Sequence, residues 1–68
     1  MTITVADLRH LATTGIITGR ELEALELQHR GLTERAIAQA LDISRSAVRG
    51  RLENGHRKIR RHRRKRAA

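Results

Sequence analysis

Four helix starts with one shared signature constrain this 68-residue chain more than any other feature of its sequence. In each, an apolar residue precedes a Thr or Ser, and a second apolar residue follows the hydroxyl residue by four positions. The hydroxyl can accept a hydrogen bond from a free N–H of the first helical turn, and the two apolar residues can close over it as a hydrophobic staple. The four sets are Ile3-Thr4 with Leu8, Ile17-Thr18 with Leu22, Leu32-Thr33 with Ile37, and Ile43-Ser44 with Val48.

Acidic residues and glycines refine where these helices begin and end. Asp7 and Glu21 each stand three residues after a capping Thr, where a carboxylate can bond back to the cap. Gly15 and Gly31 fall where a left-handed residue closes a helix. No alternating strand pattern is sustained, so we predict an all-α, compact four-helix domain with a tri-helical helix-turn-helix core. The predicted helices cover about residues 5–13, 19–30, 34–41 and 45–61.

The connection between the third and fourth predicted helices is only three residues long, residues 42–44. Such a short connection suits the steep crossing of a helix-turn-helix motif. Ile37 and Leu41 form one apolar stripe, and Val48, Leu52 and Ile59 form another that can close against it and against Leu22 and Leu25. At 100° per residue, six residues of the last helix fall opposite its stripe, on the face available to a DNA major groove: Ser46, Arg49, Gly50, Glu53, Arg57 and Arg60.

Charge is concentrated in the C-terminal third of the chain. Residues 1–44 contain four Arg and six acidic residues, a net charge of −2, whereas residues 45–68 contain eleven basic residues and one acid, a net charge of +10. Eight of the ten residues from Arg57 to Arg66 are basic, which favours phosphate contact over a solubilising role alone. The absence of aromatic residues removes the stacking platforms of single-strand binders, so duplex DNA is the expected partner.

Other classes of function lack a signal in the sequence. The four His residues do not have metal-ligand spacing, and neither a nucleophile–His–acid arrangement nor a phosphate-cradling glycine loop is present. We therefore expect no enzyme activity, no cofactor and no metal site. The N-terminus has no leader pattern and no apolar stretch is long enough for a bilayer, so we expect a cytoplasmic, nucleoid-associated protein that does not contact membranes.

The stretch "ITGRELEALELQHRGLTERAIAQALDISRSAVRGRLENGHRKIRRH", residues 17–62, resembles the C-terminal helix-turn-helix domain of bacterial sigma factors (region four) and the LuxR-type DNA-binding domain. The "TGRE" at residues 18–21 is similar to the LuxR-type entry to the first helix, residues 34–48 are similar to both groups, and residues 51–61 lean toward the sigma version. The resemblance implies a recognition helix over 45–61 that reads duplex DNA, with Arg45, Ser46, Arg49 and Glu53 facing bases or phosphates. Asp42 stands where both groups usually have Gly, so it must make the turn in left-handed geometry.

We predict a sequence-specific, duplex-DNA-binding transcriptional regulator. The helix-turn-helix domain is expected over residues 1–61, followed by a basic, disordered tail over 62–68. Arg49 can contact a base or a phosphate, Glu53 can be a surface acid or accept a bond from cytosine, and Gly50 can be a surface glycine or a point of close approach to DNA. The candidate DNA-binding residues are Thr33, Ser44, Arg45, Ser46, Arg49, Gly50, Arg51, Glu53, Arg57, Lys58, Arg60 and Arg61.

Several alternatives remain open on the sequence. The chain could be an architectural or recombination-directing DNA-binding factor of a phage or mobile element, or a module like sigma region four that binds RNA polymerase. An RNA-binding role is the weakest alternative. Val5, Leu11 and Ile16 could line the two-fold contact of a homodimer, or they could equally cover the core.

Overall fold

The structure is a computed structural model that describes the backbone of residues 3–67 and the side chains of residues 3–65. It contains four α-helices and, within those residues, no strand, which confirms the predicted all-α class. The helices are α1 (Val5–Thr13), α2 (Gly19–His29), α3 (Glu34–Leu41) and α4 (Arg45–Ala67).

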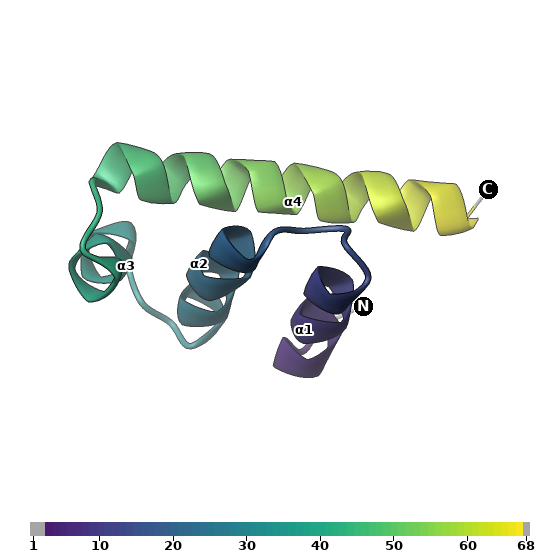
Figure 1. Cartoon of the computed structure of the whole chain (residues 1–68), viewed down its shortest axis with the longest axis horizontal. Helices are drawn as coiled ribbons and strands as arrows, with labels where there is room; N and C mark the ends of the chain where they lie inside the picture. The colour runs from purple at the N-terminus through teal and green to yellow at the C-terminus, as the bar shows by residue number, and fades with distance from the viewer. Residues whose placement is uncertain (1–2, 68) are drawn as a thin grey trace.

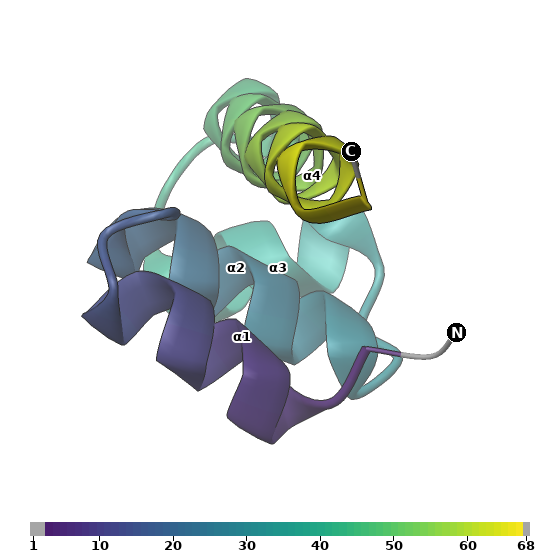
Figure 2. The ribbon, with the colours of Figure 1, turned by 90° about the vertical axis from the view of Figure 1, so that its right-hand side faces the viewer.

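Three short helices form one layer and the long helix crosses over it. Figure 1 shows α1, α2 and α3 side by side below α4, and Figure 2, turned by 90°, shows α4 nearly end-on above the same layer. α4 sets the 38 Å length of the molecule, whose other two dimensions are 19 Å. The core lies between α4 and the layer, and it contains buried apolar residues from all four helices and, in Ile17, from the connection between α1 and α2: Leu8, Leu11, Ile17, Ala24, Leu25, Ile37, Ala38, Val48, Leu52 and Ile59.

Each of the four predicted hydroxyl residues caps its helix. Thr4 accepts a bond from the N–H of Asp7 at 3.1 Å, and the Asp7 carboxylate accepts one from the N–H of Thr4 at 2.9 Å. This reciprocal pair is a capping box, and Thr18 forms a second one with Glu21. The last two helices have a single cap bond, from Ala36 N–H to Thr33 at 3.2 Å and from Ala47 N–H to Ser44 at 3.0 Å.

The first three helices each end on a left-handed residue. Gly15 and Gly31 have φ of 82° and 96°, as predicted, and Asp42 has φ of 55° and ψ of 49°. After α3, the N–H of Ile43 bonds back to the carbonyl of Ala38 at 3.0 Å, while the N–H of Asp42 lies 3.4 Å from the carbonyl of Gln39. These two bonds form a Schellman motif, with Asp42 in the position that glycine usually occupies.

α4 extends further than the sequence analysis expected. The sequence predicts a helix end near residue 61 and a disordered tail over 62–68, whereas the helix continues to Ala67 and residue 68 lies outside the described part. After Gly55 the chain has neither Gly nor Pro, and Arg and Lys are favourable helix formers, so no local signal ends the helix. The basic segment therefore belongs to a continuous rod that starts at Arg45.

Candidate nucleic-acid interface

The turn after α3 fixes which side of α4 faces outward. Ile43 packs against the core, Ser44 caps α4, and one stripe of the long helix is buried: Val48, Leu52, Gly55 and Ile59. These positions recur every three or four residues, which is the spacing of one helix face. The opposite face of α4 is therefore open along its length.

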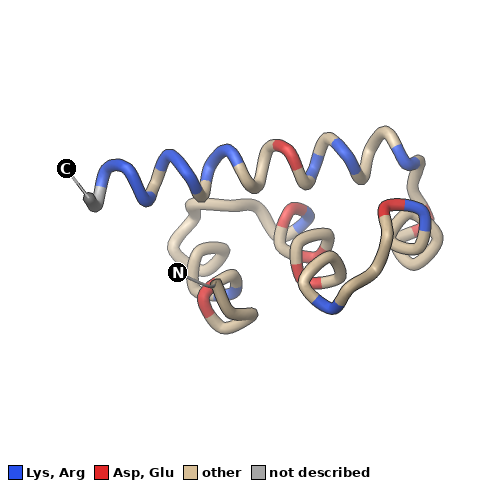
Figure 3. Tube along the Cα trace, turned by 180° about the vertical axis from the view of Figure 1, so that it is seen from behind, with Lys and Arg blue, Asp and Glu red and all other residues tan. Residues whose placement is uncertain are grey.

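The open face of α4 is strongly basic. Figure 3 shows Lys and Arg along the whole of α4. The sequence of this helix contains one acidic residue, Glu53. Of the predicted DNA-binding residues on α4, Gly50, Arg51 and Lys58 are half-buried. The remaining ones are exposed, namely Arg45, Ser46, Arg49, Glu53, Arg57, Arg60 and Arg61.

Arg49 is exposed but is not isolated on this face. Its Nη2 donates a hydrogen bond of 3.2 Å to Oε1 of Glu34, the first residue of α3. The two side chains border an open hollow between α2, α3 and α4, which is also lined by Gln28, Leu52, Glu53, His56 and Arg60. His56 crosses this hollow to Gln28, with 2.8 Å between its Nε2 and the amide oxygen. Sequence reasoning found Arg49 but gave no indication of its acidic partner.

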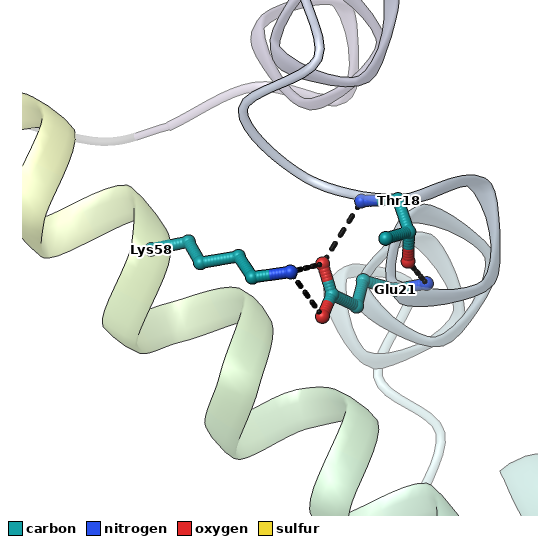
Figure 4. A network of polar contacts seen from close by, with 3 residues as sticks. All are labelled: Thr18, Glu21 and Lys58. Carbon is teal, nitrogen blue, oxygen red and sulfur yellow. Dashed lines mark hydrogen bonds and ion pairs between the residues drawn. The ribbon is translucent and has the colours of Figure 1, made fainter.

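Lys58 differs from the other predicted contacts because its amine is engaged inside the domain. Its Nζ donates to both carboxylate oxygens of Glu21 on α2, at 3.0 and 2.9 Å (Figure 4). Glu21 is buried and also accepts the N–H of Thr18 at 2.9 Å. Burial alone raises the pKa of Glu21, but the hydrogen bonds from Thr18 and Lys58 outweigh it and hold the pKa below its ordinary value. The carboxylate thus stays ionised and joins α2 to α4.

Gly55 is a buried position at which α4 packs closely against α2. A Cβ at this residue would lie 2.8 Å from Cδ1 of Leu25 and 3.6 Å from Cβ of Glu21. The missing side chain therefore lets α4 approach α2 closely, one helical turn before Lys58. Its place in the sequence, three residues after Leu52 and four before Ile59, marks it as part of the buried stripe.

Thr33 and Ser44 are exposed at the starts of α3 and α4. Each hydroxyl oxygen accepts a backbone N–H as a cap. A hydroxyl can donate as well as accept, so capping leaves the O–H of both residues free to donate to an anion. The two caps thus add hydrogen-bond donors at the start of the motif's helices.

The described part of the chain contains neither a membrane-spanning helix nor a cluster of metal ligands. In residues 3–67 no helix combines the length and apolar content needed to cross a bilayer. Within the same part of the chain, no three His, Asp or Glu side chains gather closely enough to hold a metal ion.

Comparison with known proteins points to one family. The model of the family described as "Bacterial regulatory proteins, luxR family" matches residues 16–68, which includes α2, α3 and α4. Neither a curated protein nor a solved structure matches the chain. The matched segment includes the turn around Asp42 and the whole basic face of α4.

Proposed function

This chain belongs to the luxR family of bacterial regulatory proteins, and from that premise we propose that it regulates transcription by binding duplex DNA at specific sequences. The family is one of DNA-binding regulators, which gives the general activity. We further propose that the first half of α4 enters the major groove and that its second half contacts phosphates. The observation that carries this proposal is the exposed basic face of α4, directly opposite its buried stripe.

The length of α4 supports this division of its surface. A straight helix of 23 residues extends about 35 Å, close to the length of one turn of the duplex. The major groove accepts a helix but winds around the duplex, so a rod of this length cannot follow it throughout. With the first half of α4 in the groove, the second half crosses the phosphate backbone.

The residue chemistry suggests roles along the helix. Arg49, Ser46 and Glu53 lie in the first half, where an Arg can donate to guanine and a carboxylate can accept from cytosine. At Gly50, apart from the adjacent residues and the nearby backbone of α4, no described atom lies within 4 Å of the position a Cβ would take, so a nucleic-acid backbone can approach there. We assign phosphate contacts to the caps Thr33 and Ser44 and to the other Arg residues of α4 that the sequence predicts to bind DNA, namely Arg45, Arg51, Arg57, Arg60 and Arg61. Lys58 is left out of this set because Glu21 holds its amine.

Selection of bound sequences from a pool of random duplexes tests the proposal. We expect a defined sequence to be enriched, and a palindromic one would also report a homodimer. If about six phosphates are neutralised, a plot of the logarithm of the affinity against the logarithm of the salt concentration should have a slope of about −5. A pool that stays random after selection, or an affinity that does not respond to salt, would contradict the proposal.

A second candidate function follows from the far end of α4. Arg61, Arg63, Arg64 and Lys65 are all exposed on the last turns of a continuous helix, and such a surface binds phosphates without regard to sequence. An architectural DNA-binding factor would use this end more than the first half. In that case random duplex would bind as tightly as any selected duplex.

A further inference from the structure

One acidic side chain reaches the basic face of α4 from a neighbouring helix. Oε1 of Glu34 on α3 accepts the 3.2 Å hydrogen bond from Nη2 of Arg49 on α4. Both groups are open to solvent, with 59% of the Arg49 side chain and 35% of the Glu34 side chain accessible. The pair therefore lies on the surface that DNA would meet, and it is not needed to satisfy a buried charge.

The bond leaves most of the Arg49 guanidinium available. An Arg presents five N–H donors in a planar fork, and among residues 3–65 only Glu34 accepts from Arg49. Fixing Nη2 limits how the flexible side chain can turn, since a bond at one corner of the fork orients the whole plane. The remaining donors can then bind the O6 and N7 acceptors of a guanine with less loss of side-chain entropy.

The same bond changes how Arg49 responds to phosphate. A nearby carboxylate offsets the positive charge of the guanidinium and repels a phosphate placed against it. Glu53 lines the same hollow, so negative charge borders Arg49 on both α3 and α4. Non-specific DNA binding depends on phosphate contacts, which makes this part of the basic face a weak site for a random duplex.

We propose that Glu34 is a positioning residue that sets the sequence specificity of Arg49 without contacting DNA itself. Its hydrogen bond orients the guanidinium toward a base, and its charge weakens the phosphate contact that Arg49 would make in a non-specific complex. This inference rests on the proposed function, because it requires α4 to read duplex DNA.

Two substitutions separate charge from orientation. Glu34→Gln keeps the length of the side chain and an oxygen that can accept from Arg49, but it removes the negative charge. It should raise the affinity for random duplex and steepen the salt slope by up to about 0.9, the change for one more neutralised phosphate. Glu34→Ala also removes the acceptor, so it should in addition weaken binding to the selected duplex.

The test measures dissociation constants by fluorescence anisotropy for the selected duplex and for a scrambled duplex of the same composition, over a range of salt concentrations. Glu23→Gln is the matched control, because Glu23 is exposed on α2 and has no ion pair within the described residues. We expect the ratio of the two constants to fall about three- to fivefold in Glu34→Gln, in keeping with an exposed ion pair, and more in Glu34→Ala. Glu23→Gln should leave the ratio unchanged.

A double-mutant cycle with Arg49→Ala assigns the effect to the pair. When Arg49 is absent, Glu34→Gln should change the ratio no more than Glu23→Gln does. Two results would overturn the inference while leaving the proposed function intact. One is that Glu34→Gln and Glu23→Gln change the ratio equally when Arg49 is present. The other is that Glu34→Gln still changes the ratio when Arg49 is absent. A wild-type chain that binds both duplexes equally would overturn the proposed function and the inference with it.

Discussion

Glu21 and Lys58, which are 37 residues apart in the sequence, meet across the α2–α4 interface with both carboxylate oxygens within 3.0 Å of the amine. The same carboxylate closes the capping box of α2 through the N–H of Thr18. One side chain therefore completes the start of α2 and holds α4 in place. The orientation of the basic face consequently depends on a residue far from that face.

Replacing Glu21 with Gln should destabilise the domain. Glutamine can still accept the N–H of Thr18, but Lys58 then faces a neutral partner. Because 37% of the Lys58 side chain is accessible and its amine can reach water, we expect a loss of about 1–2 kcal/mol, less than for a fully buried pair. Chemical denaturation of wild type and variant measures this difference. Glu23→Gln, at an exposed site on the same helix, is the control, and an equal effect of both substitutions would contradict the role given to the ion pair.

The contribution of Glu21 should depend on pH in a defined direction. Its pKa in the folded chain is lowered from 4.5, because the bonds from Thr18 and Lys58 outweigh the effect of burial. Folding then favours the ionised form, so the stabilisation is fully present above about pH 4.5 and is lost as the pH falls through the lower folded pKa. Hydrogen bonds with Thr4 also lower the pKa of Asp7, which adds to the acid sensitivity of wild type and variant alike.

Thermal unfolding of wild type and Glu21→Gln between about pH 7 and pH 2 isolates this contribution. The difference in Tm should be constant at neutral pH and should shrink below the ordinary pKa of a Glu. A difference that grows toward low pH would mean that Glu21 is protonated more easily in the folded chain, contrary to the geometry in Figure 4.

Two glycines of the same helix should respond oppositely to alanine. In Gly50→Ala the new Cβ meets no described atom within 4 Å beyond the adjacent residues and the nearby backbone of α4, so the gain in helix propensity should stabilise the domain by about 1 kcal/mol. In Gly55→Ala the Cβ would lie 2.8 Å from Cδ1 of the buried Leu25, and the overpacking should offset that gain and produce a net loss of up to about 2 kcal/mol. Denaturation midpoints measure both changes. Equal stabilisation by the two variants would show that α2 and α4 are not held in close approach at Gly55.

The turn before α4 should tolerate glycine. Asp42 has left-handed φ and ψ, is exposed, and makes no side-chain hydrogen bond within residues 3–65. A left-handed conformation costs a residue with a Cβ about 1–2 kcal/mol, and glycine avoids this cost. Glycine also has more conformational freedom in the unfolded chain, which offsets part of the stability gained. We expect Asp42→Gly to be neutral or to stabilise by up to about 1 kcal/mol in a denaturation experiment. Loss of stability would mean that the Asp42 side chain itself holds the turn.

The local parts of this fold could be predicted from the sequence because their signals lie within a few residues. Thr4, Thr18, Thr33 and Ser44 all cap helices, since a cap needs only a hydroxyl and the N–H groups of the next turn. The end of α4 was not predicted in the same way. Gly and Pro are absent after Gly55, and a run of Arg and Lys is compatible with either a disordered tail or a helix, since these residues are also favourable helix formers.

The pairings between helices could not be predicted from one sequence. The basic neighbours of Lys58 predict a DNA contact, whereas Glu21, which accepts its hydrogen bonds, is 37 residues away in the chain. The bond between Glu34 and Arg49 likewise depends on the crossing of α3 and α4. Counting positions around a helix gives the exposed face, but the partner of each charge on that face requires the tertiary arrangement.

The ratio of dissociation constants for a scrambled and a selected duplex, measured with the wild-type chain near physiological salt, tests the central claim most directly. If the first half of α4 reads bases, the selected duplex should bind at least about 10³-fold more tightly than the scrambled duplex. Arg49→Ala should reduce that ratio by about tenfold while leaving most of the affinity for the scrambled duplex. A ratio near one for the wild-type chain would contradict sequence-specific binding and leave only a phosphate-binding helix.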